Sequence, residues 1–600
     1  MTPCHGRPAA GRCLTAPNGR RDAQAGSDGV RAGPVATRKG TAVLICGIKL
    51  SHDGGIAVID GNRLLFSVEA EKIGNSARHS PLGDLRRVPD LLRSEGLEPA
   101  DIDRFVVDGW KSSAENPWSV STSKDGEPIA LPVAPYEDGF LSADPLHRYA
   151  FTAHDFGKRT PGYVSYHHVT NHLLGAYCSS PFAARGQDAL ALVWDGGTTA
   201  RLYGIAPAQG AVRPVARLLP LRGRLFALFS SHLGPFREIA PKTGIGADWR
   251  YRSIPGKAMA YAALGHVEQD AFPALDAFLG GMSEAARDSG PALGRELTAR
   301  RAHLFPGMSD ADLIATFQEY LGRALVSALA TVVRGRHKGR RPRLVTAGGC
   351  ALNIKWNSAI RATGLFEEIW VPPFPNDSGA ALGTACCEMV HSTRHRSLAW
   401  DVYSGPRLRR DRALPEGWRS RACDERHLAG LLHTDGSPVV VLSGRAEIGP
   451  RALGNRSIIA PATDAGTKDL LNAVKGREAY RPVAPVCLAH RAREVFDPGC
   501  DDPFMLFEHR VRPPWVSRIP AVIHLDGTAR LQTVSPTSRS AIARVLTAHE
   551  ELTGVPVLCN TSANLGGRGF FPDVASAAEW GRARYIWSDG RLFTRPEQAV

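Results

Sequence analysis

The sequence predicts an α/β protein with two domains, and three observations support that prediction. A chain of 600 residues is too long for a single hydrophobic core. Short apolar runs, typical of buried strands, alternate along it with longer segments of helical periodicity. A polar stretch rich in arginine and containing proline, residues 396–418, interrupts this alternation as a linker would. We therefore expect one domain over residues 41–395 and another over residues 419–600.

The first domain is expected to open with a β-meander. Apolar runs at 41–48, 56–60 and 64–68 are separated by Asp-Gly-Gly and Asp-Gly-Asn, which are turn sequences. Among the later segments, short continuous apolar runs indicate buried strands, and apolar residues spaced three and four apart indicate helices. In chain order, we expect strands at 189–194 and 343–346, helices at 310–333 and 378–389, and, in the second domain, strands at 438–442 and 555–559 and a helix at 574–582.

Composition and charge narrow the class of protein. Residues 1–40 are rich in Arg, Gly, Pro and Ala without an apolar signal core, so we expect a disordered leader. No apolar stretch approaches the ~20 residues of a membrane helix, and no membrane partner is expected. The eleven cysteines lack CxxC spacing, which favours reduced thiols in a cytoplasmic protein. The net charge of +14 is spread along the chain, so no nucleic-acid partner is expected.

A histidine pair is the first candidate for chemistry. His168 and His172 are four residues apart in a segment of helical character, so both rings project from one helix face and can share a metal ion. A pair at this spacing is also common in packing or at a surface. A zincin-type protease needs Glu after the first His, and Val169 excludes that chemistry.

Three further positions lie where strands meet turns or helices. Asp195 ends an expected strand and precedes two glycines, which suits a carboxylate near a phosphate or a metal but also suits a hairpin turn. Gly348 and Gly349 lie between a strand and a helix, where the backbone can approach a nucleotide, although no Walker sequence follows. Asp377 opens a helix, as a metal ligand or as an N-cap.

The second domain carries the residues of an anion site. Residues 445–456 are dense in arginine held by Gly and Pro, and guanidinium groups bind phosphate well. Segments 474–478, 526–532 and 559–564 add cations, hydroxyls and amides. Each could be an ordinary loop, but together they predict a site for a small anion.

Taken in order, these segments resemble the carbamoyltransferase family that includes the nodulation-factor, tobramycin and cephalosporin enzymes. The resemblance covers residues 42–595 and is most specific at 348–353, 449–457, 526–530 and the histidine pair. It implies an N-terminal domain of the actin-like ATPase (ASKHA) fold, related to the tRNA threonylcarbamoyladenosine synthase subunit, and a C-terminal YrdC-like domain. This sequence departs from the family pattern at Gly54, Ile448 and Ala563.

The resemblance also implies roles for individual residues. His52 would be the general base for an acceptor hydroxyl, with Asp53 as its partner, a role that histidine commonly fills in enzymes. The implied metal ligands, for a divalent ion expected to be Fe²⁺, are His168, His172, Asp195 and Asp377. The implied contacts to the nucleotide or to carbamoyl adenylate are Lys257, Gly348, Gly349 and Asn353. The implied contacts to carbamoyl phosphate and ATP are Arg451, Lys475, Arg477, Arg530, Asn560 and Ser562.

The implied activity is ATP-dependent carbamoyl transfer. Carbamoyl phosphate and ATP, the latter with Mg²⁺, would give carbamoyl adenylate, and the carbamoyl group would pass to a hydroxyl of a small-molecule natural product, as in antibiotic biosynthesis. The identity of the acceptor, and whether oxygen or nitrogen is carbamoylated, stay open, and a homodimer is an open expectation. Two alternatives are a tRNA-modifying enzyme and a non-catalytic regulator that binds an adenylate.

Overall fold

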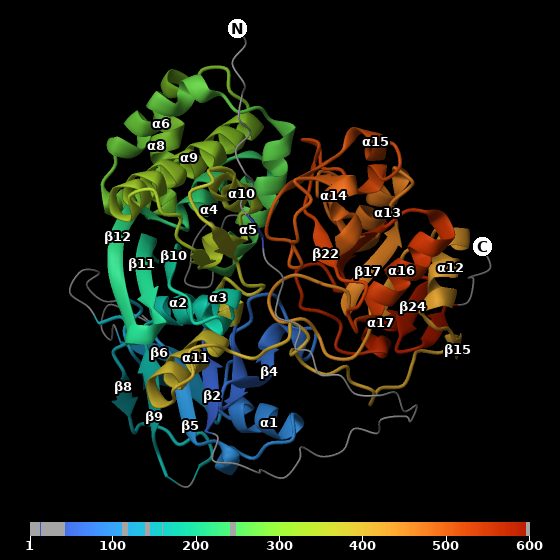
Figure 1. Cartoon of the computed structure of the whole chain (residues 1–600), viewed down its shortest axis with the longest axis horizontal. Helices are drawn as coiled ribbons and strands as arrows, with labels where there is room; N and C mark the ends of the chain where they lie inside the picture. Colours follow the sequence, from blue (N-terminus) through green and yellow to red (C-terminus); the bar gives the residue numbers. More distant parts are fainter. Residues whose placement is uncertain are drawn as a thin grey trace.

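The computed structural model describes residues 12–13, 43–110, 118–137, 144–158, 160–239 and 248–595. It contains two α/β domains that lie side by side, the N-terminal one in blue to yellow and the C-terminal one in orange to red (Figure 1). The expected α/β class is confirmed. Of the expected leader, Arg12–Cys13 is described as strand β1, and the remainder lies outside the described residues.

The first half of the N-terminal domain is a six-stranded sheet in the order β4-β3-β2-β5-β9-β8. The expected meander is confirmed, because β2, β3 and β4 pair antiparallel in sequence order. Strands β5 and β9 join in parallel on the other side of β2. The bounds are β2 Leu44–Lys49, β3 Gly55–Asp60, β4 Arg63–Glu69, β5 Arg104–Asp108, β8 Tyr149–Phe151 and β9 Tyr163–Tyr166.

The second half repeats this arrangement in the order β12-β11-β10-β13-β14-β1. Strands β10, β11 and β12 are antiparallel, and β13 and β14 join in parallel beside β10. This internal duplication is the architecture of an actin-like ATPase domain, so the expected fold is confirmed. The bounds are β10 Ala189–Val193, β11 Thr199–Ala206, β12 Ala211–Arg222, β13 Leu344–Ala347 and β14 Glu368–Trp370.

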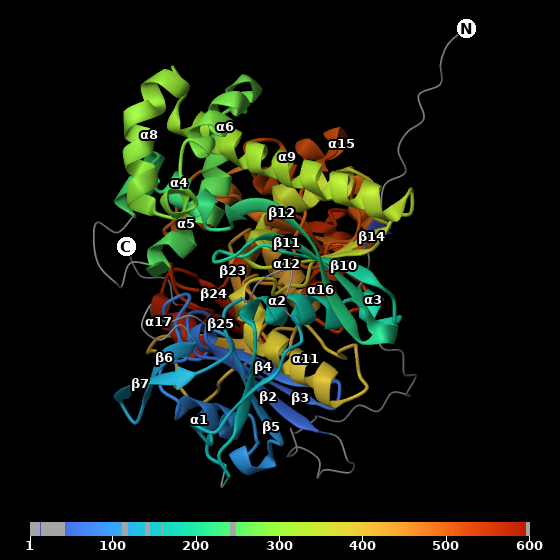
Figure 2. The same ribbon diagram turned by 90° about the vertical axis from the view of Figure 1, so that its left-hand side faces the viewer.

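Two helices in equivalent positions join the halves. Helix α2 (His168–Cys178) follows β9, helix α11 (Ala380–Ser392) follows β14, and both lie between the two sheets (Figure 2). They cross so closely that a Cβ atom on Gly383 would lie 2.1 Å from the carbonyl oxygen of Asn171. Because glycine alone leaves that space free, the small residues of α11 allow the two halves to meet.

A group of helices separates β12 from β13 and lies above the second sheet in Figure 1. The longest, α9 (Asp310–His337), begins at a capping box between Ser309 and Asp312, and it extends four residues beyond the expected helix. The others are α4 Leu225–Ser230, α5 Asp248–Tyr261, α6 Phe272–Gly280, α7 Glu284–Arg287 and α8 Gly290–Leu304.

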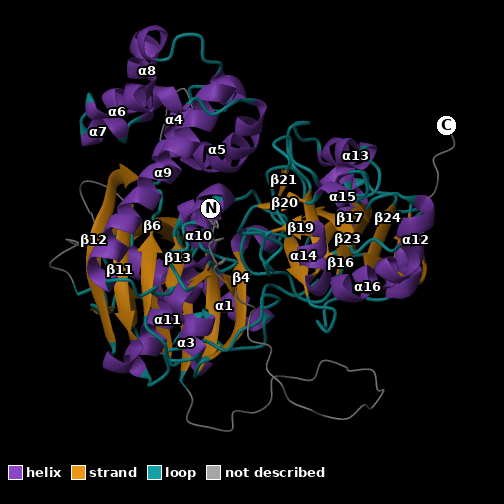
Figure 3. Ribbon diagram, turned by 45° about the horizontal axis from the view of Figure 1, so that its top comes forward, coloured by secondary structure: helices purple, strands orange, loops and turns teal. Residues whose placement is uncertain are grey.

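The C-terminal domain is built on an eight-stranded mixed sheet in the order β15-β25-β24-β16-β17-β23-β18-β22. Its strand β16 (Val439–Leu442) is apolar throughout because both faces are covered, Val439 and Val441 on one side and Val440 and Leu442 on the other. Figure 3 shows helices on both sides of this sheet. The other strands are β15 Arg419–Ala422, β17 Arg456–Pro461, β18 Ala484–Leu488, β22 Gln532–Val534, β23 Val557–Ser562, β24 Tyr585–Ser588 and β25 Arg591–Thr594.

The helices of this domain and the shorter elements complete the fold. The helices are α12 Glu425–Asp435, α13 Gly466–Lys475, α14 Ala492–Val495, α15 Pro513–Val516, α16 Ala541–Thr553 and α17 Val574–Trp580. The remaining elements are α1 Arg87–Ser94, α3 Pro181–Ala184, α10 Ile354–Ala362, β6 Ser119–Lys124, β7 Glu127–Pro132, β19 Phe496–Asp497, β20 His509–Val511 and β21 Thr528–Ala529. Among the described helices, none is long and apolar enough to cross a membrane.

The expected linker, residues 396–418, contacts both domains along its course. The backbone N–H of Leu64 on β4 donates to the carbonyl of Ala399, and that of Ser67 donates to Ser404. Further on, Leu408 N–H donates to the carbonyl of Gly444 in the C-terminal domain. The segment is therefore bound to both domains by backbone hydrogen bonds.

Candidate active site

Four buried side chains from both halves of the N-terminal domain converge on one point. His168 and His172 come from α2, Asp195 follows β10, and Asp377 precedes α11. Their ligand-type atoms all lie within 4.8 Å of one another. The Nε2 atoms of the two histidines are 3.1 Å apart. Oδ1 of Asp377 lies 3.5 Å from Nε2 of His168 and 3.4 Å from Nε2 of His172. The structure thus brings together the four residues that the resemblance implied as metal ligands.

A third carboxylate, that of Asp108, orients His168. Nδ1 of His168 lies 2.9 Å from Oδ2 of Asp108, at the end of β5, so Nε2 faces the cluster. Asp108 also accepts hydrogen bonds from Nζ of Lys49, at 2.6 Å, and from the amide of Asn171. Burial opposes ionisation of Asp108, but the charges of His168 and Lys49 outweigh it and lower its pKa to about 2.

The glycine turn after β13 lies against this cluster. The N–H of Gly349 donates to Oδ1 of Asp195 at 2.7 Å, and the hydroxyl of Tyr136 donates to Oδ2 at 2.7 Å. Gly348 has φ of +87°, and a Cβ there would lie 2.4 Å from the carbonyl oxygen of Trp194, so the turn requires glycine. The side-chain oxygen of Asn353, implied as a nucleotide contact, accepts from two backbone N–H groups and caps α10.

His52 lies beside the cluster. Its Nε2 atom is 3.4 Å from Oδ2 of Asp377, and its Nδ1 atom is 2.8 Å from Oδ2 of Asp53. The other oxygen of Asp53 is 2.9 Å from Nδ1 of His79. Burial opposes ionisation of Asp53, but the charge of His79 and the hydrogen bonds of both histidines hold its pKa well below the ordinary value. The ring of His52 is thus oriented by a carboxylate, as a general base is in many enzymes.

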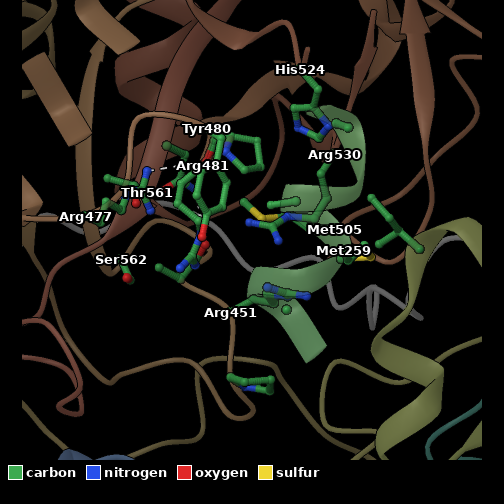
Figure 4. A pocket seen from close by; sticks show the side chains of 18 of the residues that line it. Met259, Arg451, Arg477, Tyr480, Arg481, Met505, His524, Arg530, Thr561 and Ser562 are labelled. Atoms are coloured by element: carbon green, nitrogen blue, oxygen red, sulfur yellow. Dashed lines mark hydrogen bonds between the residues drawn. The ribbon is translucent and has the colours of Figure 1, made fainter. Parts of the chain in front are cut away.

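A second site, a cavity of about 120 Å³, lies between the domains. Gly256 and Met259 of α5 and Ile354 of α10 line it from the N-terminal side. Asn560 and Ser562 of β23 line it from the C-terminal side. Five arginines line it, of which Figure 4 labels Arg451, Arg477, Arg481 and Arg530, and the fifth is Arg78.

These guanidinium groups are half-buried, and among the described residues the only carboxylate that pairs with one of them is Glu478, 3.6 Å from Arg481. Among the described residues, Nε of Arg451 and Nε of Arg530 have no hydrogen-bond partner. Burial and Arg530 hold the pKa of Arg451 well below its ordinary value, and burial and Arg481 lower the pKa of Arg530 to about 10. Burial and Arg481 also lower the pKa of Arg477 to about 9. Because a buried unpaired charge is costly, such a cluster is typical of an anion-binding site.

Two lysines of the implied set are already engaged by the protein. Nζ of Lys475 donates to the carbonyl oxygen of Ser562 at 2.6 Å and to both oxygens of Asn564 at 2.5 Å. It therefore lies behind the cavity wall and holds the end of β23. Nζ of Lys257 pairs with Oε1 of Glu478 at 3.0 Å, beside the cavity.

The sequence had not predicted Lys49, Asp108 or His79 as site residues. Lys49 and Asp108 end two parallel neighbouring strands, β2 and β5, and the carboxyl ends of such strands meet at one edge of a sheet. That signal could have identified both. His79 lies in an irregular segment, where the sequence contains no comparable signal.

The two sites together define a class of protein. It is a two-domain enzyme with a histidine–carboxylate cluster in one domain and a cationic cavity at the domain junction. The family model described as Carbamoyltransferase N-terminus matches residues 44–386, and the one described as Carbamoyltransferase C-terminus matches residues 430–584. The chain belongs to the carbamoyltransferase family, as its motifs indicated, and it is an enzyme of that class.

Relatives of nearly equal length support the assignment. Nodulation protein U of Sinorhizobium fredii is 43% identical over 565 residues, which cover 92% of this chain and 99% of that protein. The 3'-hydroxymethylcephem-O-carbamoyltransferase of Streptomyces clavuligerus is 33% identical over 543 residues, which cover 90% and 96%. Among solved structures, full-length HypF in its phosphate- and nucleotide-bound form is 12% identical, and the match covers 58% of this chain and 55% of that one with a TM-score of 0.29.

Proposed function

We propose that the protein is an ATP-dependent O-carbamoyltransferase that uses its two sites in sequence. Carbamoyl adenylate is formed from carbamoyl phosphate and ATP in the cavity between the domains, and its carbamoyl group passes to a hydroxyl of a small-molecule natural product beside the histidine–carboxylate cluster. The observation that carries this proposal is a cluster of arginines in a cavity lined by both domains, in which the buried Nε atoms of Arg451 and Arg530 have no hydrogen-bond partner among the described residues.

In the first step, the arginines bind phosphate groups. Carbamoyl phosphate loses its phosphate by hydrolysis, and an oxygen of the resulting carbamate attacks the α-phosphorus of ATP. The bond between the α-phosphorus and the bridging oxygen breaks, and pyrophosphate leaves. Guanidinium groups fixed before the reaction stabilise the negative charge that develops. Asn560 and Ser562 contribute neutral polar groups at the same wall, and Mg²⁺ would accompany ATP.

In the second step, the cluster residues act on the mixed anhydride. His168, His172, Asp195 and Asp377 form a donor set of two imidazoles and two carboxylates, which suits a divalent transition metal such as the expected Fe²⁺. The fit is supported by Asp108, which holds Nδ1 of His168 and leaves Nε2 directed at the cluster. A bound cation would supply Lewis acidity toward the carbamoyl oxygen.

His52 then serves as the base. Its Nε2 takes the proton of the acceptor hydroxyl while Asp53 holds Nδ1. The acceptor oxygen forms a bond to the carbamoyl carbon, and AMP leaves with the electron pair of the broken C–O bond. The acceptor itself is proposed only as a small alcohol.

The test is pyrophosphate release from ATP and carbamoyl phosphate, with Fe²⁺ added and each substrate omitted in turn. We expect release that requires both substrates. A folded, metal-loaded protein that releases no pyrophosphate would contradict the activation step. In that case, binding of RNA with a steep dependence on salt would favour a tRNA-modifying enzyme, and nucleotide binding without turnover would favour a regulator.

A further inference from the structure

One segment of the N-terminal domain, residues 69–79, reaches both sites. It leaves β4 and is fixed to the C-terminal domain by Lys72, a fully buried residue. Nζ of Lys72 pairs with Oε1 of Glu69 at 2.6 Å and donates to the carbonyl oxygens of Glu447 and Gly449, each at 2.7 Å. The N–H of Gly449 donates to the same Glu69 oxygen at 2.8 Å. This contact holds the loop that carries Arg451, two residues further along the chain.

The following residues pair with the C-terminal domain through their backbones. The N–H of Arg78 donates to the carbonyl of Gly567, and the N–H of Gly569 donates to the carbonyl of Ser76, each at 2.9 Å. A guanidinium nitrogen of Arg568 donates to the carbonyl of Asn75 at 3.0 Å. The position of Arg78 is therefore set by the C-terminal domain as much as by its own.

The side chain of Arg78 lines the arginine-rich cavity. Its Nε atom is buried and lacks a hydrogen-bond partner among the described residues. Its charge also contributes to the lowered pKa values of Arg451 and Arg481, behind the larger effect of burial. Arg78 thus has the same character as the arginines of the C-terminal domain, although it comes from the other domain.

The next residue, His79, faces the other site. Its Nδ1 atom is 2.9 Å from Oδ1 of Asp53, and its backbone N–H donates to Oε2 of Glu71 at 2.9 Å. Both His79 and Asp53 have left-handed backbone conformations, with φ of 61° and 53°. Residues other than glycine adopt this conformation rarely, and such strain gathers at functional sites.

We propose that residues 69–79 are an element shared by both sites, in which Arg78 binds phosphate groups in the cavity and His79 holds Asp53 so that it orients His52. This inference rests on the proposed function for its biological meaning. Its two physical claims, anion binding by Arg78 and positioning of His52 by His79, are testable without turnover. His79 is a positioning residue, since it acts on His52 through Asp53.

The experiment compares Arg78→Ala, His79→Ala and His79→Asn in the full chain by two measurements. Calorimetry with inorganic pyrophosphate measures anion binding in the cavity. NMR of ¹⁵N-labelled histidine rings measures the environment of the His52 ring at the other site. The His52 signal is assigned because it is absent in His52→Asn. Arg78→Ala should weaken pyrophosphate binding about 10- to 100-fold and leave the His52 signal in place. His79→Ala should shift the Nδ1 signal of His52 and leave pyrophosphate affinity within about twofold, which is much less than the loss of a charged hydrogen bond.

Two variants serve as controls. His79→Asn, whose amide can donate to Asp53 as Nδ1–H does, should restore the His52 signal. Arg86→Ala removes the same charge from an exposed position near the segment and should change neither measurement. Pyrophosphate binding that does not depend on Arg78, a His52 signal unmoved in His79→Ala, or the same loss in both variants would overturn the inference. Binding through Arg78 without pyrophosphate release in turnover would refute the proposed function and leave this inference standing.

Discussion

The Nδ1 atom of His168 lies 2.9 Å from Oδ2 of Asp108, and this hydrogen bond joins α2 to the end of β5. The contact leaves Nε2 of His168 directed at His172 and Asp377. The same carboxylate also binds Lys49 at the end of β2. The side chain of Asp108 therefore connects the ends of β2 and β5 to helix α2 and to its candidate ligand His168.

Asp108→Asn should reduce affinity for a divalent metal about 10- to 100-fold, because loss of a carboxylate partner weakens the histidine ligand and its orientation. Metal content by mass spectrometry and competition with a chelator measure the change. Asp90→Asn, which alters an exposed carboxylate on α1, is the matched control and should bind metal as the unaltered protein does. Equal metal affinity in both variants would contradict the role of Asp108 in orienting His168 as a metal ligand.

His52→Asn should separate the two proposed steps. Pyrophosphate release without an acceptor should be preserved, while carbamoylated product should fall at least about 100-fold, because the variant lacks the base. Both are measured on the same samples, with the exposed His427→Asn as control. If release and transfer decline together, His52 has a role in the first step that the geometry does not suggest.

Arg530→Met should stabilise the ligand-free protein and inactivate it. The variant removes an unpaired charge that lies near the guanidinium groups of Arg451 and Arg481, and we expect the free energy of unfolding to rise by about 1–3 kcal/mol. Thermal unfolding without ligand and pyrophosphate release give the two results. Arg426→Met, at an exposed ion pair, should change neither much. A destabilised Arg530→Met protein would show that Arg530 has a structural role.

Gly383→Ala should damage both fold and cluster. The added methyl group would overlap the carbonyl oxygen of Asn171, so we expect a loss of about 2–3 kcal/mol or more in stability. Helix α2 would then be displaced from Asp377, and metal affinity should fall as well. Gly430→Ala is the control, because a Cβ there meets no atom within 4 Å and removal of a helical glycine stabilises by about 0.5–1 kcal/mol. Equal stability of the two variants would contradict the close packing.

The sequence by itself determined the local features of this protein. The strands at β2, β3, β4, β10, β13 and β16 and the helices α9 and α11 occur where apolar spacing predicted them, because that spacing records which faces are buried. It also located the candidate ligands, since His168 and His172 share a face within one helix. The family followed from motifs whose order along the chain is specific.

What the tertiary structure decided is which distant residues meet. Asp377 reaches His168 because two glycine-lined helices cross between the sheets, and nothing local to either residue encodes that distance. Lysine is a common phosphate ligand, yet the ammonium group of Lys475 donates its hydrogen bonds to three oxygens of the protein itself. Arg78 and His79 are adjacent in sequence but serve opposite sites, because backbone pairing with the other domain sets their directions. Periodicity reports burial, whereas the partner of a buried charge depends on packing across the whole chain.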